Sequence, residues 1–199
     1  MSQISATMVK DLRAKTGAGI MDCREALKEN AGDVEQAAGW LRQKGISKAD
    51  KKASRETNEG RIGSYIHMGG RVGVLVEINC ETDFVAKTDE FGEFVSGVAM
   101  QIAAMSPSFV SREQVPQETI DAEIAGYKAA AIEDGKPENI AEKIAQGKVD
   151  KYFQAQCLME QSYIKDDSQT VEALVKGMIA KVGENIRIKK FSRFDLSEA

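Results

Sequence analysis

Residues 71–85 read RVGVLVEINCETDFV. Within 72–80 apolar residues recur at every second position, which is the period of a strand with one face turned to a core. The run ends in an acidic residue and a phenyl ring, Asp83 and Phe84, before a helical pattern starts at about Thr88. We expect these two side chains to stand next to each other on a loop. The pattern alone favours a phenyl ring folded back into the core, and the alternative is a ring that waits for a partner.

Two further strand patterns accompany this one, at 61–68 and 185–191. Gly69 and Gly70 are expected to connect the first strand to 71–80 as a two-residue hairpin. Helical patterns lie between the second and third strands, so we expect an α+β fold with a three-stranded, mainly antiparallel sheet packed with helices. Helices can cover one face of such a sheet, and an apolar second face would favour self-association.

Helices of the second half are marked by apolar stripes and by capping residues such as Thr88. Pro137 suits a first helical turn. The expected helices cover about 89–105, 117–134, 137–147 and 170–182. The pattern of 148–164 is less clear: Val149, Tyr152 and Phe153 look helical, and 158–164 is expected to be an irregular packed segment.

The N-terminal region reads as three short helices with apolar stripes. Two span about 6–15 and 21–30, and the third follows Asp33, a predicted N-cap, and is expected to end at Gly45. A module of about 40 residues is marginal alone, and small bundles of this kind are often docking domains. The expected parts are a three-helix docking module at 1–46, a charged linker at 47–60 and a sheet-bearing core at 61–199.

The composition is that of an ordinary globular protein and argues against several classes of function. The chain has 199 residues, 42% of them hydrophobic, and a net charge of −4, so it carries no overall basic footprint for nucleic acid. No apolar stretch approaches the roughly 18 residues of a membrane span, and no signal peptide is recognised, so we expect a cytoplasmic protein. The three cysteines form no Cys-x-x-Cys pair, which favours buried, reduced thiols over disulfides or a zinc site.

Motifs for cofactor chemistry are missing from the sequence. There is no P-loop, no dinucleotide fingerprint, and no zinc-protease or calcium-loop pattern, so we expect no cofactor and no metal. A cysteine-dependent hydrolase would need Cys80, His67 and Asp83 as nucleophile, base and orienting group. Strand alternation points Cys80 and His67 to opposite faces, which disfavours this hypothesis. Binding of another protein is therefore favoured over enzymatic activity.

Four segments resemble the elongation factor Ts family, in order and over nearly the whole chain. They are TGAGIMDCREAL at 16–27, GSYIH at 63–67, EINCETDFVA at 77–86 and GENIRI at 183–188. The resemblance implies an N-terminal three-helix domain of the ubiquitin-associated (UBA-like) type and a core that performs exchange. It implies a guanine-nucleotide exchange factor that acts on GDP-bound elongation factor Tu and has no catalytic site of its own.

By this resemblance, Phe84 is a wedge that enters the GTPase and disturbs its magnesium ion and phosphate-binding loop, so that GDP leaves. The residues implied in this step are Thr82, Asp83, Phe84 and Val85. Further contacts with elongation factor Tu are implied for Arg24, His67, Val182 and Gly183.

One departure from the family concerns the core. Many members have two related core subdomains, whereas this chain has room for one, and His67 and Val182 match contacts that different halves supply. We infer that two copies pair through their sheets, which gives a homodimer able to bind two GTPase molecules. An alternative from another class is a ribosome- or RNA-associated module that uses the basic segment from Lys48 to Arg55, although the acidic net charge argues against it.

Overall fold

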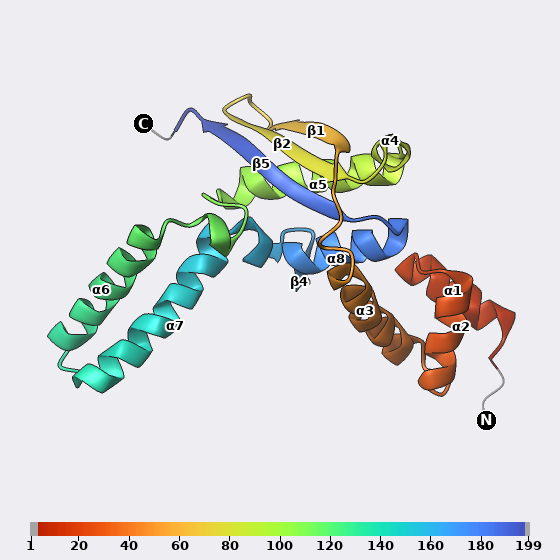
Figure 1. The fold of residues 1–199 in the computed structure, drawn as a ribbon, viewed down its shortest axis with the longest axis horizontal. Helices are drawn as coiled ribbons and strands as arrows, with labels where there is room; N and C mark the ends of the chain where they lie inside the picture. The colour runs from red at the N-terminus through yellow and green to blue at the C-terminus, as the bar shows by residue number, and fades with distance from the viewer. Residues whose placement is uncertain (1–3, 198–199) are drawn as a thin grey trace. The chain divides into compact units, whose positions relative to one another are not determined.

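The computed structural model describes residues 4–197, except for the side chains of Ile46 and Lys48, and it confirms the expected α+β fold (Figure 1). The α-helices are α1 Ala6–Thr16, α2 Ile20–Glu29, α3 Val34–Asp50, α4 Asp83–Ala86, α5 Asp89–Met105, α6 Gln117–Glu133, α7 Glu138–Gln156 and α8 Val171–Val182. The strands are β1 Glu59–Ile66, β2 Val72–Cys80, β3 Ser162–Tyr163, β4 Asp166–Thr170 and β5 Ile186–Asp195. Two short 3-10 helices are η1 Arg112–Gln114 and η2 Leu158–Glu160.

The main sheet has the strand order β1-β2-β5 and is antiparallel, as the three strand patterns predict. The hairpin between β1 and β2 is confirmed, but its connection is longer than two residues. The amide of His67 donates to the carbonyl of Val72 at 2.9 Å, and the amide of Gly70 donates back to the carbonyl of His67 at 2.9 Å. The two glycines therefore sit inside a wider turn that these hydrogen bonds close.

One face of the sheet is buried and the other is open. Val74 and Val76 on β2 are buried, and Gly63 on β1 lies directly against Val95 of α5. Large apolar side chains remain exposed on the opposite face, because residues at alternate positions of a strand point to opposite sides. These exposed residues are Ile62 and Ile66 on β1, Leu75 on β2 and Phe194 on β5.

The three N-terminal helices share a small apolar core. Leu12, Cys23 and Leu27 are fully buried in it. Asp33 caps α3 as predicted, since its carboxylate accepts a hydrogen bond from the amide of Gln36 at 2.9 Å. The predicted helix end at Gly45 is wrong, because α3 continues to Asp50. A Cβ atom at Gly45 would lie 3.1 Å from that of Ala180, so this glycine gives α8 room to approach rather than ending the helix.

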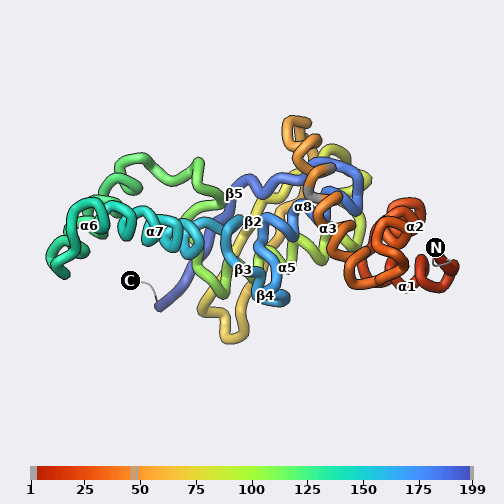
Figure 2. The backbone as a smooth tube through the Cα atoms, turned by 90° about the horizontal axis from the view of Figure 1, so that it is seen from below, coloured from red at the N-terminus to blue at the C-terminus, as the bar shows by residue number. Residues whose placement is uncertain are grey.

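Helices α6 and α7 lie side by side as an antiparallel pair (Figure 1), and both lie at the same end of the tube in Figure 2. The predicted end of α7 near Gly147 is wrong, since the helix continues to Gln156. Val149 and Phe153 lengthen its apolar stripe and pack with Val115 and Cys157, and this burial outweighs the low helix propensity of one glycine. The segment expected to be irregular contains η2 and also forms β3, which pairs antiparallel with β4.

The described chain falls into two spatial units, each assembled from three separate segments. The first contains the residues up to Arg61 together with 78–94 and 173–187. The second contains 62–77, 95–172 and the residues from Ile188 onward. The segment around Phe84 and the turn that follows α8 both belong to the first unit, although about 100 residues separate them along the chain.

Candidate partner-binding site

Phe84 is exposed to solvent on 78% of its surface. It lies on α4, a four-residue helix, rather than on the open loop that the sequence suggested. Thr82 caps this helix by accepting a hydrogen bond from the amide of Val85 at 3.4 Å. Val85 and Ala86 are buried and take up the inner side of the helical turn, which leaves the phenyl ring outside. The interpretation that Phe84 folds back into the core is therefore wrong.

Asp83 places a negative charge beside this ring. Its carboxylate forms an ion pair with Lys87, one helical turn later, with 2.5 Å between Oδ2 and Nζ. The hydrogen bond from Lys87, together with its charge, holds the pKa of Asp83 below the ordinary value. The carboxylate is therefore ionised at neutral pH, and the short helix α4 carries the exposed Asp83–Lys87 ion pair next to the exposed ring of Phe84.

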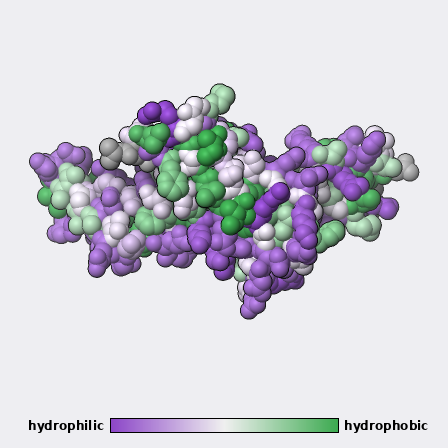
Figure 3. Space-filling model, turned by 90° about the horizontal axis from the view of Figure 1, so that it is seen from above, coloured by the Kyte–Doolittle hydropathy of each residue, from purple (hydrophilic) through white to green (hydrophobic). Residues whose placement is uncertain are grey.

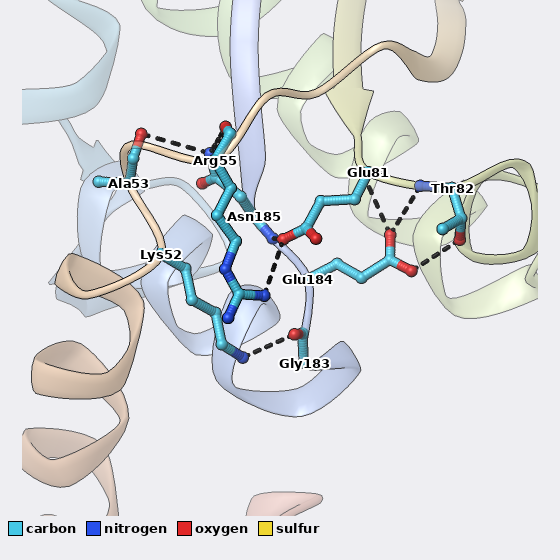
Figure 4. A network of polar contacts seen from close by, with 8 residues as sticks. All are labelled: Lys52, Ala53, Arg55, Glu81, Thr82, Gly183, Glu184 and Asn185. Atoms are coloured by element: carbon cyan, nitrogen blue, oxygen red, sulfur yellow. Dashed lines mark hydrogen bonds and ion pairs between the residues drawn. The ribbon is translucent and has the colours of Figure 1, made fainter.

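Thr82 is held in place by the side chain of Glu184 (Figure 4). Oε2 of Glu184 accepts from the amides of Glu81 at 3.1 Å and Thr82 at 3.0 Å. Oε1 accepts from the hydroxyl of Thr82 at 2.6 Å. Hydrogen bonds to an ionised acceptor are about twice as strong as neutral ones. One carboxylate thus binds both of the residues that lead into α4.

Glu81 makes the reciprocal contact. Its Oε1 accepts from the amide of Asn185 at 2.6 Å and lies 3.4 Å from a guanidinium nitrogen of Arg55. Asn185 is only 4% exposed, and its side-chain amide donates to the carbonyls of Arg55 at 2.8 Å and Ala53 at 3.4 Å. The turn after α8 therefore fixes both the segment before β1 and the segment before α4 (Figure 4).

Cys80 completes this arrangement from the end of β2. Its thiol donates to the carbonyl of Thr82 at 3.1 Å. Burial, followed by the negative charge of Glu184, raises the pKa of the Cys80 thiol to about 11. A thiol with that pKa is protonated at neutral pH, and the thiolate is the nucleophilic form. This counts against the hypothesis of a cysteine-dependent hydrolase.

The other residues predicted to contact a partner lie on three different elements. Arg24 is exposed on α2, and His67 is exposed just beyond β1, where its Nδ1 lies 3.1 Å from the hydroxyl of Tyr65. Val182 is half-buried at the end of α8, and Gly183 follows it in the left-handed region with a φ of 81°. Among these four, Gly183 is the one that adjoins the contacts around Thr82, because it precedes Glu184 in the same turn.

The basic segment considered for RNA binding is partly engaged within the protein. Nζ of Lys52 donates to the carbonyl of Gly183 at 2.6 Å, and Arg55 pairs with Glu81. The side chain of Lys48 lies outside the described residues. These intramolecular contacts reduce the positive charge available to a nucleic acid.

The sequence did not reveal that three residues of the site act as structural supports. Glu81, Glu184 and Asn185 were noted only as letters within family-like motifs. Glu184 lies 103 and 102 positions from Glu81 and Thr82, and Asn185 lies 104 positions from Glu81, and no periodicity links such distant positions. The available signal was that both motifs contain an acidic residue, Glu81 in one and Glu184 in the other.

Comparisons with known proteins define the family. The family model described as elongation factor TS matches residues 45–198. A protein called elongation factor Ts from Desulfosudis oleivorans is 54% identical over 198 residues, which cover 100% of both chains. Proteins of the same name from Syntrophomonas wolfei and Carboxydothermus hydrogenoformans are 53% and 55% identical over 195 residues, 98% of this chain and 91% and 90% of theirs.

These matches define the class of protein as a translation elongation factor. The chain belongs to the elongation factor Ts family, whose members act as nucleotide exchange factors in translation elongation. Within residues 4–197, no helix combines the length and the apolar character that a membrane crossing requires.

Proposed function

We propose that this protein binds GDP-bound elongation factor Tu in the cytoplasm and promotes GDP release by inserting Phe84 into the GTPase. The observation that carries the proposal is the exposure of Phe84 on a capped helical turn, beside the ionised carboxylate of Asp83. Because this phenyl ring is exposed in the free protein, it can be buried at an interface without loss of packing in the core.

The energy available from such a contact suits exchange. Burial of one phenyl side chain is worth roughly 1.5–3 kcal/mol, and each 1.4 kcal/mol changes an affinity about tenfold. A nucleotide is held by magnesium and by amides at a helix end, so small displacements of these groups weaken its binding strongly. Exchange then follows from negative coupling, in which the factor and GDP weaken each other's binding equally.

Additional contacts complete the proposed interface. Arg24 contributes from the UBA-like docking module, and His67, Val182 and Gly183 contribute from the core. All four are exposed or half-buried, so none needs to leave a packed position to reach a partner. Thr82 and Val85 act by shaping α4, the first as its cap and the second as its buried anchor.

Homodimer formation through the sheet is the second part of the proposal. Four large apolar side chains are exposed on the open face of the second unit, namely Ile62, Ile66, Leu75 and Phe194. Hydrophobic residues gather in the centre of the view from above, over the sheet (Figure 3). An apolar face of this kind on a small sheet is stabilised when a second sheet covers it, and a symmetric pair of identical faces is the commonest solution.

The decisive experiment measures release of a fluorescent GDP analogue from elongation factor Tu in the presence of magnesium. We expect strong acceleration by the natural protein and little by Phe84→Ala. Ile132→Ala, which shortens an exposed apolar side chain on α6, is the matched control and is expected to act like the natural protein. Equal acceleration by Phe84→Ala would refute the role of the ring, and no acceleration by the natural protein would refute the exchange function.

A further inference from the structure

Phe84 can displace groups of a partner only if the helix that carries it is held in one orientation, and α4 is too short to be stable on its own. A helix of four residues closes barely one turn, and isolated helices of that length are not stable in water. The direction in which Phe84 points therefore depends on what holds the residues on either side of α4. Val85 and Ala86 are buried on one side, and the hydroxyl of Thr88 holds the exit by donating to the carbonyl of Val85 at 2.8 Å. The entry depends on what holds Glu81 and Thr82.

Glu184 supplies that support. Both of its carboxylate oxygens are used, and the amides of Glu81 and Thr82 and the hydroxyl of Thr82 all donate to it. The hydroxyl that binds Glu184 is also the atom that caps α4 through the amide of Val85. Through the hydroxyl of Thr82, Glu184 therefore fixes the first turn of the helix that carries Phe84.

Glu184 is itself held in place by contacts of its two neighbours in the chain. Asn185, the next residue, is buried and donates to the carbonyl of Arg55, while its backbone amide donates to Glu81. Gly183, the preceding residue, is bound through its carbonyl to Lys52. Contacts therefore run in both directions between the turn at 183–185 and the segment at 81–82. We refer to this pair of mutually bonded segments as the Glu81–Glu184 clasp.

We propose that Glu184 is a positioning residue for nucleotide exchange, which fixes the orientation of Phe84 by clasping the entry to α4. This inference rests on the proposed function. Without the clasp, α4 samples several orientations in the free protein. Part of the binding free energy is then needed to order α4 at the interface, and that part no longer contributes to the displacement of GDP. Glu184→Met, which keeps the length of the side chain but removes its acceptors, is expected to lower the maximal rate of GDP release at least about tenfold.

A conservative replacement separates positioning from charge. In Glu184→Gln the amide oxygen can accept from the two backbone amides, and the amide nitrogen can donate to the hydroxyl oxygen of Thr82. The geometry of the clasp is then retained without the negative charge. We expect Glu184→Gln to keep a maximal release rate within about threefold of that of the natural protein.

The test combines two measurements on the full chain. GDP release from elongation factor Tu is followed at increasing concentrations of the factor, so that the maximal rate and the half-saturating concentration are obtained separately. Amide hydrogen exchange of the free factor is measured in parallel at Glu81 and Thr82. Glu138→Ala is the control, because its carboxylate also accepts a side-chain contact, from Nζ of Lys128 at 2.8 Å, but joins α7 to α6 far from α4 in the sequence.

The proposal is supported if Glu184→Met lowers the maximal rate of GDP release and speeds amide exchange at Glu81 and Thr82, while the half-saturating concentration stays similar. Glu184→Gln must then recover both the maximal rate and the amide protection. A natural maximal rate in Glu184→Met refutes the clasp and leaves the exchange function standing. Failure of the natural protein to accelerate release refutes the exchange function and this role with it. If Glu184→Met loses amide protection along the whole chain, Glu81→Met decides by the same two readouts, because it removes the contacts with Asn185 and Arg55 and leaves Glu184 intact.

Discussion

Gly63 on β1 lies so close to Val95 on α5 that a Cβ atom at position 63 would stand 2.2 Å from Cγ1 of the valine. Val76 of β2 is the next neighbour of that hypothetical atom, at 3.5 Å. The absence of a side chain at Gly63 therefore sets how closely α5 approaches the sheet. Residue 63 is one of the five letters of the GSYIH segment, and its packing gives a physical reason for a glycine there.

Gly63→Ala is expected to destabilise the protein by about 1–3 kcal/mol, because the added methyl group overpacks the contact with Val95. Urea unfolding measures this change. Gly126→Ala on α6 is the matched control: its Cβ would meet nothing within 4 Å, so it is expected to stabilise by about 0.5–1 kcal/mol. A neutral Gly63→Ala would show that α5 can move away from the sheet without cost.

Phe84→Ala is expected to change the free energy of unfolding by no more than about 0.5 kcal/mol, since 78% of the residue is exposed to solvent. Phe91→Ala provides the contrast, because Phe91 is fully buried and its truncation is expected to cost about 3–5 kcal/mol. Urea unfolding of the two variants measures both values. A strongly destabilised Phe84→Ala protein would indicate that the ring packs inward in solution.

Gln101→Leu is expected to destabilise the protein by about 2–4 kcal/mol, because it leaves buried polar groups without partners. Gln101 is fully buried on α5, and its Nε2 donates to Oε1 of Gln161 and to the carbonyl of Ser162, both at 3.1 Å. Its Oε1 accepts from the amide of Ile164 at 2.8 Å. Thermal unfolding measures the loss, and amide exchange at Ile164 should rise in parallel. An unchanged midpoint would contradict this account of the amide cluster.

Alkaline pH is expected to weaken the fold through two buried thiols. Burial raises the pKa of both Cys80 and Cys157 from 9.0 to about 11. The folded state then holds these protons more tightly than the unfolded state, so the stabilisation is complete below pH 9 and is lost as the pH rises from 9 to about 11. Urea unfolding between pH 8 and 11 should show this fall.

The double variant Cys80→Ala/Cys157→Ala serves as the comparison for the alkaline experiment. Its absolute stability is expected to be lower, because two buried side chains become smaller. Its loss of stability between pH 9 and 11 should nevertheless be shallower than that of the natural protein. Identical pH slopes for the two proteins would exclude the thiols as the cause.

Ile62→Glu/Ile66→Glu is expected to give a monomer, because two charges on the apolar face of β1 would have to be desolvated in a sheet-to-sheet dimer. Light scattering at micromolar concentration measures the mass. The natural protein and Ile132→Glu, altered on α6, are expected to remain dimeric. A natural protein of monomeric mass would contradict the proposed pairing.

Local patterns predicted most of the secondary structure. The two-residue period predicted β1, β2 and β5, although β1 lies at 59–66 rather than 61–68 and β5 continues to Asp195 rather than ending at 191. The apolar stripe predicted α5 at its observed bounds. The caps at Asp33 and Thr88 were predicted from side chains that bond three residues ahead, and both are present. These features are local, so a single sequence contains what is needed to predict them.

Predictions failed where a distant contact overrode a local signal. Gly45 and Gly147 looked like helix ends, but packing against α8 in one case and a continued apolar stripe in the other extended the helices through them. The small sheet of β3 and β4 was missed because its strands are short and carry little alternation.

For the candidate site, the sequence by itself determined the family, the strand that leads to Asp83 and Phe84, and the presence of both side chains at a junction before a helix. Only the tertiary structure decided that Phe84 points outward and that Glu184 holds the entry to α4. The physical reason is the range of the interactions. Periodicity and capping act within a few residues, whereas the exposure of a ring and the partner of a carboxylate depend on segments that meet only after the chain has folded.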